Sequence, residues 1–309
     1  MIPKEIFREI ENLKEDNQSG ANEFILKALS IINDQLNYIK DQNKDISALV
    51  LALSKEIISS RPSMAPLINT IGFLIHDLVT INKSSILSRI SKLKKKREEA
   101  LSKLSLNFNS FLKRIGEASL MLISYSSTIL DLLTKYDKNN LILYILESRP
   151  LLEGQYVAQI LSKKYKTHLL VDAAMGKFID KVDYVLIGVD SILNDGSVIN
   201  KVGTFPLAVL AKSTKVEVYA ICDSFKYNVM SHYGLEVEIE EKPIEQVYNK
   251  EFDNKLLKIH NYYFDKTPPE FIKGIISEFG ILSIQEFINQ VRNELPIEWY
   301  NKLMRSEIV

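Results

Sequence analysis

The largest concentration of polar residues in the sequence lies between residues 188 and 204, directly after an apolar run. It contains a carboxylate, Asp190, a glycine-containing turn, and the pairs Asn200-Lys201 and Gly203-Thr204. A carboxylate at the end of a strand can act as a general acid or base. An ammonium group and the backbone N–H groups of a helix start can bind an anion such as phosphate. The same residues also fit a simpler hypothesis, in which Asp190 caps a helix and Lys201 is a solvated side chain.

Arg149 follows a second apolar run and comes directly before Pro150. Proline is common at the first position of a helix, so this arginine is expected next to a helix N-terminus. Its guanidinium group could hold a phosphate whose remaining oxygens meet the N–H groups of that helix. Alternatively, Arg149 forms a surface ion pair with Glu147 or Glu153.

The tripeptide Arg61-Pro62-Ser63 is a third candidate, in the N-terminal half of the chain. Arg61 could reach across a cleft between two domains and bind a ligand there. The alternative is an ordinary capped helix start.

Other catalytic chemistries have little support. The sequence contains neither a GxxxxGK[ST] loop nor a GxGxxG fingerprint, so we expect no cofactor. The only cysteine, Cys222, is predicted to be a buried, inert thiol and cannot form an internal disulfide. The four histidines lack metal-ligand spacing, so we assign no metal site to His76, His168, His232 and His260.

The charge balance of the chain restricts its partners. Its 309 residues include 39 Lys and Arg and 39 Asp and Glu, so the formal net charge is zero. This argues against nucleic-acid or membrane binding as the main activity, because polyanion binding normally requires a positive field. The basic run at 89–97 is followed at once by Glu98 and Glu99, which is typical of a solvated helix face. With no signal peptide and no long apolar segment, the chain is predicted to be cytoplasmic and not to span a membrane.

The predicted secondary structure that positions these residues changes near residue 117, from helices alone to alternating strands and helices. Residues 1–116 have apolar side chains at helical spacing and are predicted to form a helical domain, which a helix from 84 to about 114 closes. Residues 117–309 are predicted to form a Rossmann-like α/β domain, an open parallel sheet flanked by helices. Its best strand candidates are the apolar runs 120–123, 141–146, 168–171, 184–189 and 216–221. Ligands bind beyond the carboxyl ends of such strands, which is where Arg149 and Asp190 are expected.

Five stretches, taken in order, resemble the translation initiation factor 2B alpha/beta/delta subunit family over nearly the whole chain. They are residues 60–63, 147–154, 188–204, 223–227 and 264–272. The resemblance implies a homo-oligomer, at least a dimer, formed through the C-terminal domain. It also implies that the partner is initiation factor 2, bound through the alpha subunit of that factor, with the N-terminal helical domain as the docking face.

The same family contains sugar-phosphate isomerases, whose catalytic groups are an aspartate and a cysteine. Asp190 matches the aspartate, but the resemblance places Tyr125 at the cysteine position, and a phenol of pKa ~10 is a poor substitute for a thiol of pKa ~8.5. Residues 19–23, Ser-Gly-Ala-Asn-Glu, stand where the isomerases have Arg-Gly-Ala-Gly-Arg. Two arginines that hold phosphate are therefore missing, and Glu23 would repel a phosphate.

Three hypotheses follow. The first is a non-catalytic, delta-like regulatory subunit homologue that binds initiation factor 2 and retains a pocket for a sugar phosphate or nucleotide. The second is an aldose–ketose isomerase of the ribose-1,5-bisphosphate isomerase type, with Asp190 as the acid or base. The third is an inactive isomerase pocket that still senses a phosphorylated ligand. The predicted ligand-binding residues are Arg61, Arg149, Asn200, Lys201, Gly203 and Thr204.

Overall fold

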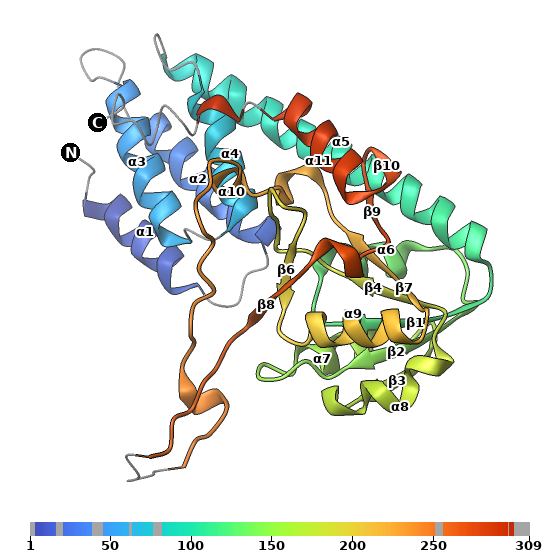
Figure 1. Ribbon diagram of the computed structural model, residues 1–309. Helices are drawn as coiled ribbons and strands as arrows, with labels where there is room; N and C mark the ends of the chain where they lie inside the picture. Colours follow the sequence, from blue (N-terminus) through green and yellow to red (C-terminus); the bar gives the residue numbers. More distant parts are fainter. Residues whose placement is uncertain are drawn as a thin grey trace.

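The computed structural model describes residues 4–16, 21–38, 46–61, 64–76, 82–250, 256–295 and 297–299. Ser19, Gly20, Pro62 and Ser63, which contribute to the sequence interpretation, lie outside these ranges. The described chain begins with helices and continues as an α/β fold (Figure 1). In the described residues, no helix combines the length and apolar character needed to cross a membrane.

The helical part packs around a shared apolar core. Nearly every residue of its fourth helix is buried, which explains why that helix is apolar on all sides. The last helix begins where the Asn82 side chain accepts a hydrogen bond from the Ser85 N–H, and it ends at Gly116, whose φ of 68° suits glycine. The predicted long helix is confirmed within one residue at each end. The helices are α1 (Lys4–Glu15), α2 (Ala21–Tyr38), α3 (Ile46–Ser60), α4 (Ala65–Ile75) and α5 (Lys83–Ile115).

A seven-stranded sheet forms the centre of the α/β part, with the strand order β10-β9-β7-β4-β1-β2-β3. All neighbouring strands are parallel except the pair β9 and β10. The five predicted strands are confirmed. The run 141–146 matches β2, and the ends of the other four differ from the prediction by one or two residues. The sequence interpretation missed the two short strands at one edge. The strands are β1 (Ala118–Ile123), β2 (Leu141–Leu146), β3 (Lys166–Leu170), β4 (Tyr184–Ile187), β7 (Glu217–Ile221), β9 (Gly274–Ser277) and β10 (Gly280–Leu282).

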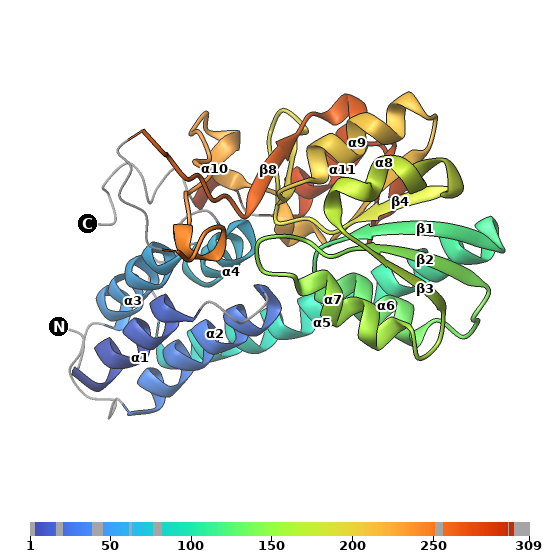
Figure 2. The same cartoon turned by 90° about the horizontal axis from the view of Figure 1, so that it is seen from below.

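Helices cover both faces of this sheet, as Figure 2 shows. On one face lie α6, α7 and part of α5, and on the other lie α8 and α9. The helices of this part are α6 (Ser127–Lys135), α7 (Glu153–Leu161), α8 (Met175–Phe178), α9 (Thr204–Ser213), α10 (Val229–His232) and α11 (Ile284–Glu294). Short 3-10 turns are η2 (Asp172–Ala174), η3 (Ile179–Lys181), η4 (Ser224–Lys226), η5 (Ile244–Gln246) and η6 (Pro269–Phe271).

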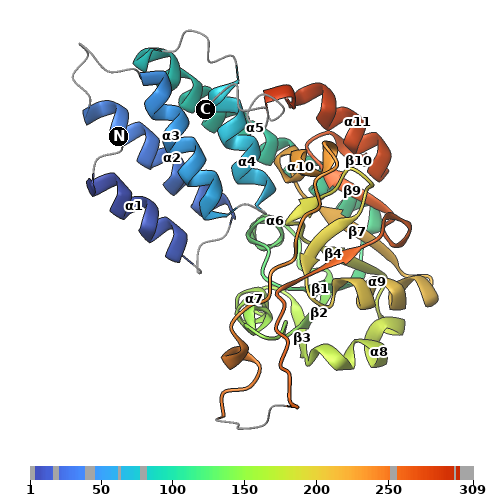
Figure 3. The same cartoon turned by 60° about the vertical axis from the view of Figure 1, so that its left-hand side comes forward.

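A second, antiparallel sheet has the order β5-β6-β8, with β5 (Ser191–Ile192), β6 (Val198–Lys201) and β8 (Phe264–Thr267). The sequence interpretation did not predict it. Between η4 and β8, the described residues 236–250 and 256–262 also form an arm that extends away from the rest of the molecule (Figure 3). The base of this arm passes close to the carboxyl ends of the parallel strands and contributes to the site below.

The helical part and the sheet are joined by buried contacts. The Asn69 side chain of α4 donates to the carbonyl oxygens of Phe225 (2.8 Å) and Tyr227 (2.6 Å). In α5, Phe108 and Phe111 pack with the sheet strands, whereas the first half of the helix packs with the N-terminal helices. One helix therefore belongs to both cores and fixes their relative position.

Candidate functional site

A cavity of about 490 Å³ lies where the carboxyl ends of β1, β4 and β7 face the helical part and the base of the arm. Its size is within the usual range for small-molecule sites. The wall formed by the sheet includes residues 123–128, 188–191, 199–201 and 221–223. The opposite wall comes from Asp16, Asn22, Arg61 and residues 237–240. The predicted position of the site, at the carboxyl edge of the parallel sheet, agrees with this cavity.

Asp190 lines the cavity and is half-buried. Burial raises the pKa of its carboxyl group, whereas the ammonium groups of Lys226 and Lys201 act in the opposite direction, and Glu153 raises the pKa further. The hypothesis that Asp190 caps a helix is wrong, because the next residues form β5 and the Asp190 N–H pairs with the Ile199 carbonyl of β6 (2.9 Å).

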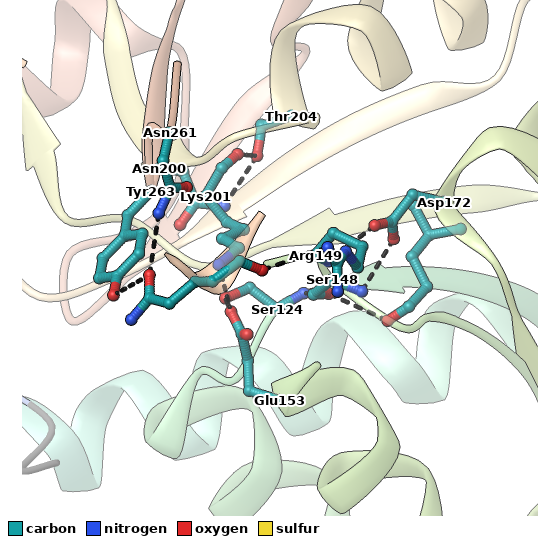
Figure 4. A network of polar contacts seen from close by, with 12 residues as sticks. Ser124, Ser148, Arg149, Glu153, Asp172, Asn200, Lys201, Thr204, Asn261 and Tyr263 are labelled. Carbon is teal, nitrogen blue, oxygen red and sulfur yellow. Dashed lines mark hydrogen bonds and ion pairs between the residues drawn. The ribbon is translucent and has the colours of Figure 1, made fainter. Parts of the chain in front are cut away.

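Lys201 is buried, with 3% of its surface exposed, so its interpretation as a solvated side chain is wrong. Its Nζ lies 3.0 Å from Oε1 of Glu153, the first residue of α7, and 5.3 Å from the ring centre of Tyr263. The same Oε1 accepts a hydrogen bond from the Ser124 hydroxyl (2.8 Å), which joins β1, β6 and α7 in one polar network (Figure 4). Lys201 and Glu153 were separate candidates in the sequence, and their pairing was not predicted.

Arg149 lies next to this network, but its side chain is exposed and does not line the cavity. Its guanidinium group donates to the Gln246 carbonyl of the arm (3.2 Å), so the expected ion pair with Glu147 or Glu153 is absent among the described contacts. The Arg149 N–H donates to Oδ2 of Asp172 (2.7 Å) (Figure 4). In this structure, Arg149 connects the arm to the end of β2.

The start of α9 is occupied by a carboxylate of the protein itself. Asp265 Oδ2 accepts hydrogen bonds from the Gly203 N–H (2.7 Å) and the Phe205 N–H (3.1 Å), and burial raises the Asp265 pKa to about 6. Thr204 is fully buried and hydrogen-bonds to the Asn200 side chain (3.0 Å). Gly203 and Thr204 do open the predicted helix, but neither lines the cavity. The structure thus brings Asp190, Asn200, Lys201 and Arg61 to the cavity and leaves Arg149, Gly203 and Thr204 outside it.

Two cations reach the cavity from different sides. Arg61, at the end of α3, donates to the Asp16 carbonyl and lies 5.5 Å from the Phe24 ring centre. Lys226 in η4 is half-buried and faces Asp190 closely enough to affect its pKa. In the sequence, Lys226 stood out only as part of the stretch 223–227. Its position just after the fifth predicted strand was the signal that could have identified it.

The residue expected at the position of the isomerase cysteine, Tyr125, is 39% exposed and lies on the cavity wall. Its ring contacts Tyr156 edge-to-face at 5.8 Å, and the cavity beside it stays open. Burial raises the Tyr125 pKa, with smaller effects from Tyr156 and Glu23. Cys222, also on the wall, is the buried thiol that the sequence predicted, and burial raises its pKa well above the ordinary value.

No three or more His, Cys, Asp or Glu side chains are arranged to hold a metal ion in the described ranges. Asn22 lines the cavity, and the neighbouring Glu23 lies 3.1 Å from the Lys27 ammonium group. The site is therefore a polar cavity whose described lining contains several carboxylates and four cations, among them Arg61 and Lys226.

Comparisons with known proteins find relatives that share most of the length of this chain. Over residues 17–284 the chain matches the family model "Initiation factor 2 subunit family". It is 27% identical to a protein named translation initiation factor eIF-2B subunit 2-like from Pyrococcus furiosus, covering 91% of this chain and 98% of that protein. It is 26% identical to ribose 1,5-bisphosphate isomerase from Methanocaldococcus jannaschii, covering 92% of each.

The fold is shared with a crystal structure of translation initiation factor eIF-2B from Pyrococcus horikoshii. The TM-score is 0.76 and the identity 24%, covering 91% of this chain and 98% of the other. Proteins named as translation factors and proteins named as isomerases are thus matched about equally well. The family match extends over most of the chain, from the helical part to the end of the sheet. The chain belongs to the initiation factor 2 subunit family.

Proposed function

We propose that this chain is a non-catalytic regulatory homologue of the initiation factor 2B subunits, with a cavity that binds a phosphorylated small molecule. A sugar phosphate needs a cation for its phosphate and polar groups for its hydroxyls. Lys226 and Arg61 meet the first need, and Asp190 and Asn200 meet the second. The volume of about 490 Å³ leaves room for a ligand of this size.

The protonation of the Cys222 thiol and the Tyr125 phenol supports the proposal that the chain is not catalytic. Cys222 is the only cysteine of the chain, it is 2% exposed, and its raised pKa keeps the thiol protonated at neutral pH. The raised pKa of Tyr125 likewise keeps its phenol protonated. Neither residue supplies the anionic nucleophile or base that would work together with Asp190.

Thermal unfolding in the presence of phosphorylated pentoses and nucleoside monophosphates tests the ligand. A ligand at 100 times its dissociation constant is expected to stabilise the protein by about 2.7 kcal/mol. The variant Lys226→Met should lose this shift. The control Lys163→Met, which changes an exposed lysine away from the cavity, should keep it. The proposal fails if no such compound stabilises the protein, or if Lys226→Met responds like the original chain.

The partner part of the proposal rests on the family resemblance. Initiation factor 2 would bind through its alpha subunit to the N-terminal helical domain, residues 1–116. The α/β domain, residues 117–309, would form a homo-oligomer, at least a dimer. Its edge strand β3 and the residue after it expose Leu169 (48%) and Val171 (57%), which is unusual for a free sheet edge. A pull-down with purified initiation factor 2 subunits and light scattering of the purified chain test the two statements, and no retention or a monomer would contradict them.

An isomerase acting on a phosphorylated pentose is the second candidate. It is favoured by Asp190, whose raised pKa in an open cavity suits a general acid. Incubation with ribose 1,5-bisphosphate and with methylthioribose 1-phosphate, followed by detection of the ketose, tests it. Turnover that Asp190→Asn abolishes would replace the non-catalytic proposal.

A further inference from the structure

The strongest unexplained feature of the cavity is the ion pair between Lys201 and Glu153. The Lys201 side chain is 4% exposed, and its Nζ lies 3.0 Å from Glu153 Oε1. A buried ammonium group needs a partner of opposite charge, and removing that partner is costly. Lys201 therefore lines the cavity as a cation whose charge is already compensated by the protein.

The second carboxylate oxygen of Glu153, Oε2, takes no part in the ion pair with Lys201. Its Oε1 accepts from both Ser124 and Lys201, whereas its Oε2 is buried and has no hydrogen-bond partner among the described residues. A buried acceptor without a donor is unfavourable unless a ligand or water supplies one. Glu153 lines the cavity, and a ligand hydroxyl that reached Oε2 would supply the missing donor.

The other charged residues of the cavity wall also reduce the positive charge that is available to a ligand. A second wall lysine, Lys242, is also ion-paired within the wall, to Glu240 (2.5 Å). Among the described lining residues there are four cations and six carboxylates, so the wall carries more negative than positive groups. The cations are Arg61, Lys201, Lys226 and Lys242, and the carboxylates are Asp16, Glu153, Asp190, Asp223, Glu238 and Glu240.

We infer that Glu153 determines which class of phosphorylated ligand the cavity accepts. By compensating Lys201 and presenting Oε2 as an acceptor, it selects a polyol with one phosphate over a bisphosphate. One phosphate can lie at Lys226 and Arg61. A second phosphate near Lys201 would meet the Glu153 carboxylate, whose charge repels it. This inference rests on the proposed ligand-binding function of the cavity.

Calorimetric titration with ribose 5-phosphate and ribose 1,5-bisphosphate at one ionic strength tests the inference. The original chain should bind the monophosphate more tightly. Glu153→Gln should shift the ratio of the two dissociation constants toward the bisphosphate by about tenfold or more, which corresponds to ~1.4 kcal/mol. The control Glu147→Gln, on the same loop but outside the cavity, should leave the ratio unchanged.

The double variant Glu153→Gln/Lys201→Met tests the same claim even if Glu153→Gln alone does not fold, because it removes both charges of the pair. The charges of Glu153 and Lys201 cancel, so removing both leaves the net charge of the cavity wall unchanged. The double variant should therefore keep the ratio of the two dissociation constants within about threefold of the original, well below the tenfold change (~1.4 kcal/mol) expected for Glu153→Gln. A tenfold loss of bisphosphate binding in the double variant, or an unchanged ratio in a folded Glu153→Gln, would overturn the inference. If no phosphorylated compound binds the original chain, the proposed function fails instead. Even in that case, if Glu153→Gln binds the bisphosphate and the original chain does not, the result would support the inference that Glu153 excludes a second phosphate.

Discussion

Glu278, in the turn between β9 and β10, gives a prediction whose size follows from its surroundings. Its Oε1 accepts the Ser224 N–H at 3.0 Å, and Oε2 is buried without a hydrogen-bond partner in the described part of the chain. Burial, and then the neighbouring Asp223 carboxylate, raise the Glu278 pKa to about 7. Ionised Glu278 therefore destabilises the folded protein at neutral and alkaline pH.

The magnitude follows from the difference between about 7 and the ordinary value of 4.5. Each pH unit corresponds to about 1.4 kcal/mol, so the penalty reaches about 3 kcal/mol once the group is ionised in the folded state. Because the folded-state pKa is the higher one, the folded state holds its proton longer than the unfolded state. Stability is thus lost as the pH rises from about 4.5 through about 7, and the loss is complete above that.

We expect Glu278→Gln to remove this penalty, because the amide keeps an acceptor for Ser224 and can donate toward Asp223. Urea unfolding from pH 4.5 to 8.5 should give equal free energies of unfolding for variant and original at the acid end. The variant should be more stable by about 2 to 3 kcal/mol above pH 7.5. The control Glu270→Gln changes an exposed carboxylate and should show no such pH-dependent difference. A constant difference at all pH values, or a less stable variant at pH 8, would refute the reasoning.

Two further predictions concern stability. Gly154→Ala should lower the free energy of unfolding by about 3 kcal/mol or more, since the new Cβ would lie 1.8 Å from the carbonyl oxygen at the end of β2. Gly176→Ala, where nothing lies within 4 Å, should be nearly neutral, and equal effects of the two in thermal unfolding would contradict the close packing of α7 on β2. Asn69→Ala should cost about 2 to 3 kcal/mol, because it leaves the carbonyls of Phe225 and Tyr227 without their donor. Denaturant unfolding measures this, and a loss below about 0.5 kcal/mol would show that the α4–η4 contact is unimportant for stability.

Four of the five predicted strands, β1, β2, β4 and β7, were predictable because each is a mostly apolar run that is largely buried in the sheet. The fifth, β3, is an edge strand in which only Leu170 is buried, so its apolar signal is weaker. The second sheet was not predictable, because β6 pairs with β8, and no local pattern indicates which distant segment will become its neighbour. β9 and β10 are four and three residues long, too short for a clear alternation.

The placement of some residues on the cavity wall was predictable from the sequence, and that of others was not. The position of Asp190 followed from the rule that polar residues after parallel strands meet at one edge. Asp265 accepts hydrogen bonds from Gly203 and Phe205 at the start of α9, although it lies 62 and 60 positions further along the chain. The sequence therefore indicated that a helix begins there, but not that a carboxylate of the protein occupies its N-terminus. The pairing of Lys201 with Glu153 likewise depends on how β6 and α7 are placed in three dimensions.

The central claim is that the cavity binds a phosphorylated small molecule and does not convert it. A series of ³¹P NMR spectra of ribose 1,5-bisphosphate and ribose 5-phosphate, recorded over hours with the purified chain, tests both parts in one measurement. We expect broadened or shifted resonances in the presence of the protein for the monophosphate, and no new resonance for either compound. Unchanged spectra would contradict binding, and a growing ketose phosphate resonance would show that the chain is an isomerase.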